Sequence, residues 1–345
     1  MNSTSLRVLG ASLVAIAALA ASANAVSAQD WSGKTLKIIV PYGPGGTYDK
    51  YSHSFSKHLG KQIPGKPTII MQHMPGAGGT KAMNWHYNVA VPNGHTLLIP
   101  LDNAVVNQLL RPKRVKYDAR GYTWLGSSNQ TNQVMIIRSD TGVNKWQDLR
   151  GRNTIAAAAG KAGFDHVAMS LFRSLLKFNL KIVTGYKGST ATTFAVEQGE
   201  VEANCNNWLA YSSKVPHWFT GNKPFANAVV QLGVFRDPDL PDNIPLLHEL
   251  VSDPKDKAAV DFVSVAGLLG RGLVVPPKTN KGVINMLRGA YDKMNLDRAF
   301  KSELKKKRLR LIAANGAEIQ KIVNKAINEA SPEIVAHARK LIVGK

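Results

Sequence analysis

An apolar run leads directly into a glycine-rich turn in the stretch LKIIVPYGPGGTYD, residues 36–49. The same order returns in the stretch TIIMQHMPGAGGT, residues 68–80. Each apolar run has the length of a buried strand, and the residues after each turn favour a helix. Strands that alternate with helices are typical of α/β proteins with a parallel sheet. The sequence therefore predicts an α/β fold.

The two glycine-rich turns are candidate anion sites. Such turns direct several backbone N–H groups toward one point beside the positive end of a helix, which suits a carboxylate or a phosphate. Glycine has no Cβ, so a ligand can approach the main chain closely. Neither turn is a nucleotide motif. Lys81 follows Thr80, so the G-K-[ST] order is absent, and Tyr48 and Lys81 stand where G-x-G-x-x-G has its last glycine.

The first residues have the pattern of a cleaved secretory signal. Arg7 precedes an apolar stretch at 8–21, and small residues follow it. The alternative is a membrane anchor, but the apolar stretch is shorter than the ~20 residues that span a bilayer. We therefore expect residues 1–28 to be a signal peptide, cleaved after Ala25 or Ala28, and the mature protein to be periplasmic.

Length and composition restrict the class of protein further. A chain of 345 residues with 44% hydrophobic residues is long enough for two lobes. Cys205 is the only cysteine, which excludes a disulfide framework, a zinc ribbon and a CxxC redox motif. The nine histidines form no H-E-x-x-H motif. We therefore expect no metal site and no cofactor.

The charge of the chain bears on its partners. The formal net charge is +21 at pH 7, and the basic residues are spread along the chain. One dense run, KSELKKKRLR at 301–310, is interpreted as a solvated helix face. Nucleic-acid binding would require clustered basic residues with aromatic residues between them, so we expect no nucleic-acid partner. The charge instead favours anionic solutes, an anionic membrane surface or an anionic partner.

The order of predicted elements indicates two lobes. Strands are expected at 36–40, 68–74, 96–99, 134–138, 154–158, 181–184, 201–204, 228–233 and 273–275. Helices are expected at 47–60, 80–89, 102–110, 165–177 and 188–198, with several charged helices after 278. One lobe would comprise 29–138 and 235–345, and the other 139–234. Ligands of open α/β sheets bind outside the carboxyl ends of the strands, where both glycine turns lie.

The chain also contains a series of motifs that resemble those of one known family. In chain order they are P-x-x-P-G-G-T-x-D at 41–49, M-P-G-A-G-G at 74–79, P-x-G-H-T-L-L at 92–98, H-V-A at 166–168, Y-K-G at 186–188, G-E-V-E at 199–202 and L-H-E at 247–249. In this order they resemble the extracytoplasmic solute receptors of tripartite tricarboxylate transporters, the Bug/TctC family. The resemblance covers nearly the whole mature chain.

The resemblance implies a two-lobed type II periplasmic-binding-protein fold with a ligand cleft between the lobes. In this family, main-chain amides, hydroxyl groups and bridging water hold the carboxylate of a small organic acid, and an arginine clamp is not the usual device. The loaded receptor docks on the large and small subunits of a membrane permease. A monomer without catalytic activity is therefore expected.

The chain departs from the family pattern at two places. The loop before His166 reads Gly160-Lys-Ala-Gly-Phe-Asp165 instead of a loop rich in glycine, serine and threonine. Gly185 stands where a proline often precedes the Y-K-G turn. Lys161 or Phe164 would reshape the pocket toward a larger or aromatic acid. The identity of the acid stays open, from citrate-like tricarboxylates through small dicarboxylates to aromatic acids.

The candidate site combines both glycine turns with segments of the second lobe. The predicted ligand-binding residues are Tyr42, Gly45, Gly46, Thr47, Tyr48, Asp49, Gly78, Gly79, Lys161, Gly163, Phe164, Asp165, Tyr186 and Asn204. Purely structural roles are the alternatives: Thr47 as a helix N-cap, Asp49 in a first helical turn, and Lys161 as a solvated cation. Asn204, with Asn206 and Asn207, would equally serve turns and caps.

The predicted function is that of an exported receptor for an organic acid. Two alternatives are kept: a ligand sensor of the same fold that feeds a signalling kinase, and a periplasmic hydrolase or lyase. An enzyme would need a paired base and nucleophile or a metal. No G-x-S-x-G motif is present. Genes for a large and a small membrane subunit beside this one would support transport.

Overall fold

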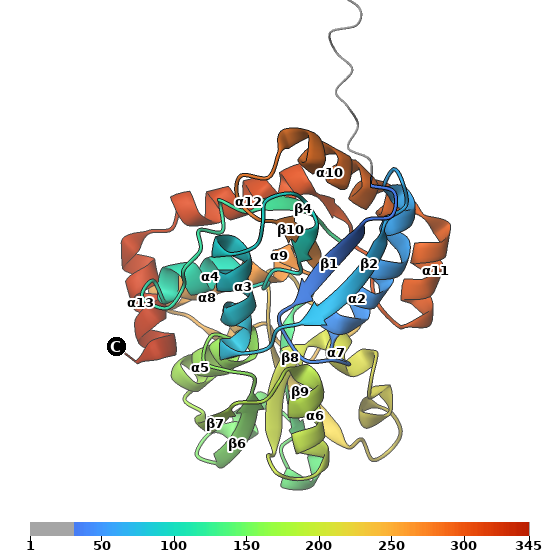
Figure 1. Ribbon diagram of the computed structural model, residues 1–345. Coiled ribbons are helices and arrows are strands. Elements are labelled where there is room, and N and C mark those ends of the chain that lie inside the picture. The colour runs from blue at the N-terminus through green and yellow to red at the C-terminus, as the bar shows by residue number, and fades with distance from the viewer. Residues whose placement is uncertain (1–30, 345) are drawn as a thin grey trace, which may run out of the picture.

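The structure is a computed structural model that describes residues 31–344 (Figure 1). The predicted signal peptide, residues 1–28, lies outside the described residues. Within the described range, none of the helices has the length and apolar character needed to cross a membrane. Figure 1 shows two lobes, one above the other, each built around its own sheet.

The upper lobe contains a six-stranded sheet in the order β11-β4-β10-β3-β1-β2. Its strands are β1 (Thr35–Val40), β2 (Thr68–His73), β3 (Thr96–Leu98), β4 (Thr123–Ser127), β10 (Gly272–Val275) and β11 (Ala314–Asn315). β1 pairs in parallel with β2 and β3, whereas β10 runs antiparallel to β3 and β4. The sheet is therefore mixed, and the prediction of a parallel sheet holds only for the part that carries the two glycine turns.

The lower lobe contains a five-stranded sheet in the order β7-β6-β8-β5-β9. Its strands are β5 (Gln133–Arg138), β6 (Asn153–Ala158), β7 (Asn179–Thr184), β8 (Ala203–Asn207) and β9 (Ala226–Leu232). β6 is parallel to β7 and β8, and β5 is antiparallel to β8 and β9. β5 is the first strand of this sheet along the chain and begins at Gln133. The lower lobe therefore begins before residue 139, where the sequence predicted its first residue.

Helices cover both sheets. Those of the upper lobe are α2 (Thr47–His58), α3 (Thr80–Asn88), α4 (Ala104–Leu110), α10 (Lys281–Leu296), α11 (Arg298–Lys306) and α12 (Gly316–Asn328). Those of the lower lobe are α5 (Phe164–Leu176), α6 (Ser189–Glu197) and α7 (Trp208–Ser212). On α2, Tyr51 and Phe55 are fully buried with Leu59 just beyond the helix end, on the face that their spacing of four predicts.

Two later helices, α8 (Pro254–Ser264) and α13 (Pro332–Val343), share an apolar cluster with the lower lobe. The short helix α9 (Ala266–Leu269) lies between the lobes, since Ala266 belongs to that cluster and Leu269 to the core of the upper lobe. Val335, Ala338 and Ile342 of α13 are buried in the apolar cluster that also contains α5 and α8 side chains. This spacing of three and four places them on one helix face. In Figure 1, α13 accordingly descends beside α5, although 235–345 was expected to belong to the other lobe.

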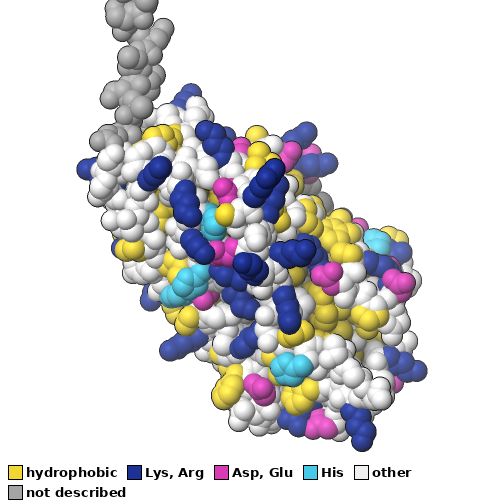
Figure 2. All heavy atoms as spheres, turned by 90° about the vertical axis from the view of Figure 1, so that its right-hand side faces the viewer, with side chains coloured by type: hydrophobic (Ala, Val, Ile, Leu, Met, Phe, Trp, Pro, Cys, Tyr) yellow, Lys and Arg dark blue, Asp and Glu magenta, His cyan; other side chains and the backbone are white. Residues whose placement is uncertain are grey.

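The basic run at 301–310 lies on α11 and the turn that follows it. Figure 2 shows Lys and Arg side chains gathered on the face of the molecule that carries this helix. A shallow groove on the surface is lined by Lys50, His53, Ser213, Lys306, Lys307 and Arg308. Lys50 Nζ of the upper lobe donates to the Ser213 carbonyl oxygen of the lower lobe at 3.1 Å. The groove therefore spans both lobes.

Candidate ligand-binding site

A small cavity lies between the two lobes, where the first glycine turn faces the lower sheet. The upper lobe contributes Tyr42, Gly43, Gly46, Thr47, Tyr48, Asp102 and Arg271. The lower lobe contributes Gln133, Ala159, Phe164, Asp165, Gly188, Ser189, Asn206 and Asn207. The free space is about 40 Å³. A water molecule needs ~10–15 Å³ of such space, so this closed arrangement admits water but no acid of several carbons.

Arg271 is the cation of the cavity and directly precedes β10. Its side chain is 1% exposed, and Nη1 donates to Asp102 Oδ2 at 2.9 Å. Nη2 donates to Thr47 Oγ1 at 3.2 Å, and the guanidinium lies 3.8 Å from the centre of the Tyr48 ring. Among the described residues, nothing accepts a hydrogen bond from Arg271 Nε, although it is buried. One donor of a buried guanidinium is therefore unused.

The surroundings of Arg271 keep it charged. Burial lowers the pKa of Arg271, but Tyr48 and Asp102 raise it by more, so its pKa lies above the ordinary value. A buried charge needs a partner, and loss of one partner of a buried pair costs ~3–5 kcal/mol. Asp102 meets that need in the closed arrangement of the lobes. A guanidinium with an unused donor is well suited to bind a carboxylate.

Thr47 connects the two lobes at the cavity. Asn207 Nδ2 of the lower lobe donates to Thr47 Oγ1 at 2.9 Å, and Arg271 donates to the same oxygen. Asn207 is itself held in place, because its Oδ1 accepts from Ala210 N at 3.1 Å as the N-cap of α7. A hydroxyl group accepts two hydrogen bonds and donates one. Both acceptor positions of Thr47 are filled, so its proton remains free to donate.

Asp165 is the second acidic residue of the cavity, in the first turn of α5. Its Oδ2 accepts from Ala159 N at 2.6 Å and its Oδ1 from His166 N at 2.8 Å. Burial raises the pKa of Asp165 to about 7; the two backbone hydrogen bonds oppose this rise, and Asp102 adds to it. The carboxyl group therefore changes its charge near neutral pH.

Aromatic side chains form the walls of the cavity. The Tyr42 and Tyr48 ring centroids are 4.9 Å apart. Tyr42 Oη donates to the Gly78 carbonyl oxygen at 3.0 Å, and Tyr48 Oη accepts from Asp102 N at 3.1 Å. Phe164 of the lower lobe is 4% exposed. The cavity thus combines apolar walls with a few fixed polar groups, as small-molecule sites usually do.

The structure brings some of the predicted site residues together and leaves others outside. Those that line the cavity are Tyr42, Gly46, Thr47, Tyr48, Phe164 and Asp165. Those that do not line it are Gly45, Asp49, Gly78, Gly79, Lys161, Gly163, Tyr186 and Asn204. The first glycine turn therefore contributes more to the cavity than the second.

Asp49 stabilises the first turn from within. Gly45 N donates to Asp49 Oδ2 at 2.8 Å, and His73 Nε2 lies 2.7 Å from Asp49 Oδ1. The Gly45 N–H is thereby occupied and Asp49 already has two partners. The arrangement corresponds to the structural alternative for Asp49, a carboxylate that accepts in the first helical turn.

The second glycine turn contacts the backbone of the other lobe. Gly78 has φ 63°, and a Cβ there would lie 2.2 Å from Gly163 N. A Cβ on Gly160 would lie 2.7 Å from Gly78 N. Asn103 and Asn107 Nδ2 also donate to the Ala162 carbonyl oxygen, at 3.0 and 2.8 Å. These glycines permit the close approach of the two lobes.

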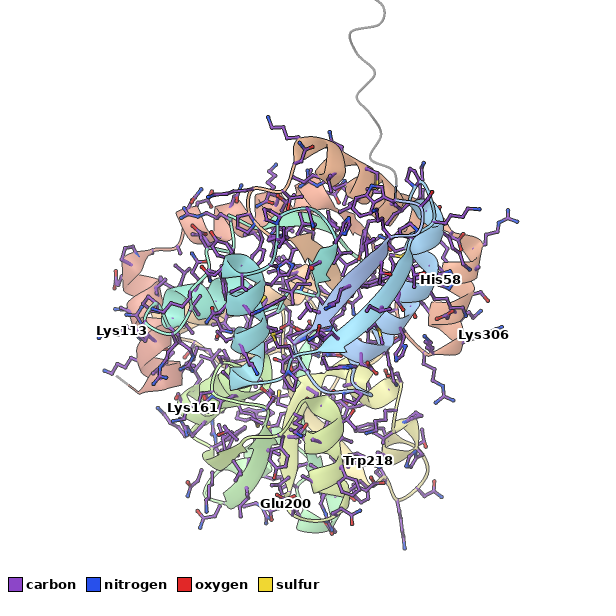
Figure 3. The ribbon with its side chains drawn as sticks, in the orientation of Figure 1. His58, Lys113, Lys161, Glu200, Trp218 and Lys306 are labelled. Atoms are coloured by element: carbon purple, nitrogen blue, oxygen red, sulfur yellow. The ribbon has the colours of Figure 1, made fainter. Side chains whose placement is uncertain are left out.

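Three predicted residues of the lower lobe are used elsewhere. Tyr186 Oη donates to Glu200, which Figure 3 shows at the far end of the lower lobe. The Lys161 side chain is exposed at the lobe junction, and its carbonyl oxygen accepts from Arg111 Nη2 at 2.7 Å. Asn204 is buried below the cavity, where its Oδ1 accepts from Tyr211 Oη at 2.7 Å.

Several cavity residues were absent from the predicted set: Gly43, Asp102, Gln133, Ala159, Gly188, Ser189, Asn206, Asn207 and Arg271. One signal was available in the sequence. Arg271 interrupts an apolar stretch, LLGRGLVV at 268–275, and a charged residue inside a buried apolar stretch needs a buried partner. Asp102 was expected to begin a helix, but Asn103 is the N-cap of α4, and Asp102 pairs with Arg271.

The described residues contain no cluster of three or more His, Cys, Asp and Glu side chains that would hold a metal ion. Cys205 is buried, and burial raises its pKa well above the ordinary value, with Asp165 adding to the effect. A thiol in that environment is inert. The side chains that line the cavity offer hydrogen bonds and ion pairing to a ligand.

Comparisons of sequence connect the chain with UPF0065 proteins of two Bordetella species. It is 34% identical over 107 residues to a UPF0065 protein of Bordetella bronchiseptica, and 24% identical over 197 residues to a UPF0065 protein of Bordetella pertussis. These alignments span 31% and 55% of this chain, and only 31% and 59% of the relatives' own lengths. No protein-family model matches the chain.

Comparisons of structure connect it with periplasmic binding proteins. BugD has a TM-score of 0.70 at 18% identity, covering 89% of this chain and 97% of BugD. Rpa4515 of R. palustris, solved with adipate, has a TM-score of 0.69 at 16% identity, covering 90% and 98%. MatC from Rhodopseudomonas palustris, solved with bound malate, has a TM-score of 0.68 at 20% identity, covering 88% and 98%.

These likenesses confirm the predicted α/β fold of two lobes around two sheets, the fold of periplasmic binding proteins. They also confirm the resemblance to Bug-type solute receptors that the sequence motifs indicated.

Proposed function

We propose that this protein is an extracytoplasmic solute receptor that binds a small organic carboxylate and delivers it to a membrane transporter of the tripartite tricarboxylate type. The observation that carries the proposal is the buried Arg271 in a cavity between two lobes, with an unused Nε donor. Solved relatives of the same fold hold adipate and malate, both of which are carboxylates.

Binding is coupled to the movement of the lobes. The closed cavity of about 40 Å³ is too small for an acid, so the lobes separate before the ligand enters. The ligand then replaces water next to Arg271, Thr47 and Asn207, which come from both lobes. A ligand that touches both lobes favours the closed state, because only that state satisfies both ends of the ligand.

A purely binding role is supported by the cavity's side chains. Ser189 and Thr47 are its aliphatic hydroxyl groups, and Asp102 and Asp165 are its carboxyl groups. Within the described range no hydrogen bond joins either hydroxyl to either carboxyl, so the paired nucleophile and base that a hydrolase needs are not assembled in this arrangement. A sensor that feeds a kinase would use the same cavity, so gene neighbourhood and transport assays separate it from a receptor for uptake.

The test is a thermal-shift screen of organic acids with the mature protein. Binding to the folded state stabilises it by ~3 kcal/mol when the ligand exceeds its Kd ~100-fold, and the melting temperature rises with concentration. We expect at least one mono-, di- or tricarboxylate to produce this rise. A rise with neutral compounds alone would contradict the proposed ligand class.

Gly46→Val tests the place of binding. Gly46 has φ −79° and ψ 177°, which valine adopts without strain, so the upper lobe should still fold. A Cβ there would lie 2.7 Å from Ser189 Oγ across the cavity, and the valine methyl groups would reach further. The variant should therefore fail to close, and its affinity should fall at least ~100-fold because the contacts from the lower lobe are lost.

The matched control is Gly289→Ala in α10, where an added Cβ has no atom within 4 Å. It should bind as the wild type does, with a small gain in stability of ~0.5–1 kcal/mol. If Gly46→Val retains wild-type affinity in isothermal titration calorimetry, the ligand does not bind in this cavity.

A further inference from the structure

The groove beside α11 concentrates positive charge where the two lobes meet. It lies outside the ligand cavity, and its lining residues come from α2, from the end of α11 and from the lower lobe: Lys50, His53, Ser213, Lys306, Lys307 and Arg308. No Asp or Glu within the described range lines it. Its free space is about 420 Å³, against about 40 Å³ in the cavity between the lobes. The groove therefore has room for a partner with negative charge.

Most of this positive charge is not neutralised by the chain itself. Lys306 and Arg308 are exposed, and neither forms an ion pair with a described residue. Lys307 Nζ pairs with Glu303 Oε1 at 2.7 Å, but Glu303 also pairs with Lys57 at 2.6 Å. Figure 2 shows Lys and Arg side chains gathered on this face. A surface of this kind attracts anions and anionic proteins.

The groove is complete only when the lobes are closed. Lys50 Nζ of the upper lobe donates to the carbonyl oxygen and to Oγ of Ser213 in the lower lobe, at 3.1 and 2.9 Å. Lys307 Nζ donates to Ser54 Oγ at 2.9 Å, one helical turn after Lys50 on the same helix. Separation of the lobes would carry Ser213 away from Lys50 and leave one wall of the groove without the other.

Closure also brings cations of the two lobes together. Burial lowers the pKa of Lys50, and Lys214 of the lower lobe and Lys307 of the upper lobe lower it further, whereas Asp49 raises it. Like charges that approach each other repel, and an anion placed among them offsets that repulsion. An anion in the groove would therefore favour the closed lobes, and closure would strengthen its binding by the same factor.

We propose that this groove is the docking surface for an acidic segment of a partner protein, and that the segment binds the closed form in preference to the open one. A protein segment can enter a groove between two lobes, whereas the surface of a bilayer is too flat to fill it. A single-stranded nucleic acid would stack its bases on aromatic side chains, and none lines the groove in the described part of the chain. The inference rests on the lobe closure of the proposed function and not on the identity of the ligand.

A disulfide can hold the lobes closed without any ligand, which makes the closed form available for the test. A Cβ on Gly43 of the upper lobe would lie 3.3 Å from Lys187 Cβ of the lower lobe, close to the ~3.5–4.5 Å of natural disulfides. Gly43→Cys combined with Lys187→Cys should therefore cross-link the closed form, and a reductant should release it. Cys205 is buried and should stay unreacted. Titration of free thiols verifies the cross-link.

The probe is a fluorescein-labelled octaglutamate peptide, with octaglutamine as its uncharged control. Fluorescence anisotropy at constant ionic strength measures Kd for the cross-linked protein and for the same protein after reduction. We expect octaglutamate to bind the cross-linked form at least ~5-fold tighter, which is the lower end of the usual coupling between two sites. Octaglutamine should bind neither form.

Charge reversal in the cross-linked protein locates the binding. Lys306→Glu with Arg308→Glu should weaken octaglutamate binding at least ~10-fold, because two attractions are lost and two repulsions are added. The matched control is Lys113→Glu with Arg114→Glu, which changes the net charge equally at two exposed residues. Figure 3 shows Lys113 on the opposite side of the upper lobe from Lys306. The control should keep most of the affinity, and melting temperatures verify that both variants fold.

Three results would overturn the inference. The first is equal affinity of the cross-linked and reduced forms for octaglutamate. The second is an equal loss in the two charge-reversed variants, which would mean that the peptide responds only to net charge. The third is binding to vesicles of phosphatidylcholine and phosphatidylglycerol that requires Lys306 and Arg308, without binding of the peptide, which would assign the surface to a membrane.

These outcomes are separate from those of the proposed function. The cross-linked protein needs no organic acid, so docking of octaglutamate can be measured even if no carboxylate raises the melting temperature. In that case the proposed ligand fails and the docking surface stands. If carboxylates bind and octaglutamate does not distinguish the closed form from the open one, the receptor role stands and the docking surface fails.

Discussion

Asp165 shows how the interior changes the chemistry of a single residue. Burial raises the pKa of this carboxyl group from 3.8 to about 7. The ionisable groups that interact with it are Asp102, Tyr42, Cys205 and Tyr211. Burial raises the pKa of the two tyrosines and the cysteine, so they stay neutral in the range where Asp165 titrates. A carboxyl group that titrates near pH 7 makes stability depend on pH in that range.

The sign of this dependence follows from the direction of the pKa change. Between about pH 4 and pH 7, the folded chain holds a proton on Asp165 that the unfolded chain has released. The free energy of unfolding therefore decreases as the pH rises through this interval and levels off above it. At ~1.4 kcal/mol per pKa unit, Asp165 accounts for at most ~4 kcal/mol of this decrease.

Asp165→Asn removes this dependence, which gives a prediction at the residue scale. Its free energy of unfolding, measured by urea denaturation from pH 4.5 to 8.5, should fall less with rising pH than that of the wild type. Comparing the two slopes cancels the other titrating groups. If the free energy of unfolding of the variant and that of the wild type change in parallel with pH, Asp165 is ionised in the folded protein over the whole range from pH 4.5 to 8.5.

At the scale of a single element, helix α13 stabilises the lower lobe, although the helices before it in the chain belong to the upper lobe. Its buried side chains, Val335, Ala338 and Ile342, lie in one cluster with residues of α5 and α8. α5 begins at Phe164 beside the cavity, so α13 supports the helix that carries Asp165. A terminal helix of this kind is held by burial rather than by its own propensity.

The prediction at this scale is that Ile342→Ala destabilises the protein by ~2–4 kcal/mol, because it leaves a cavity in a packed cluster. The matched control, Ala336→Ser, lies on the exposed face of the same helix and should change stability by no more than ~0.5 kcal/mol. Urea denaturation measures both. Equal effects of the two substitutions would mean that α13 is not packed on the lower lobe in solution.

At the scale of the whole molecule, the net charge of +21 should influence the capture of an anion. Lys and Arg side chains gather over the face that carries α11 (Figure 2), and the groove lined by Lys50, Ser213 and Lys307 spans both lobes. A positive field of this size raises the rate at which anions arrive, and salt screens it over a Debye length of ~10 Å at 0.1 M.

We therefore expect the association rate constant of an anionic acid to fall several-fold as NaCl is raised from about 0.02 M to about 0.3 M. The dissociation rate constant should hardly change. The bound ligand lies in a closed cavity that dissolved salt ions do not enter, so salt does not weaken its interactions with the protein. Stopped-flow tryptophan fluorescence measures both constants. An association rate that does not depend on salt would show that the charge serves another purpose.

Much of the architecture could be predicted from the residues alone. The strands at β1 and β2, the glycine turns after them and the helix face of Tyr51 and Phe55 follow from local patterns. β4 was not predicted, because its five residues include a glycine and show no clear alternation of apolar and polar side chains. The antiparallel direction of β10 was equally hidden, since direction depends on where the chain re-enters the lobe.

For the site, local sequence determined the glycine turn and the resemblance to a family of receptors, because backbone conformation and helix ends depend on near neighbours. Only the tertiary structure decided which side chains share the cavity. Arg271 is 169 residues from Asp102 and 224 from Thr47 along the chain, and Asn207 is 160 from Thr47. The energy of a buried charge depends on how close its partner lies in space. The separation of two residues along the sequence does not predict a contact that forms only where two lobes meet.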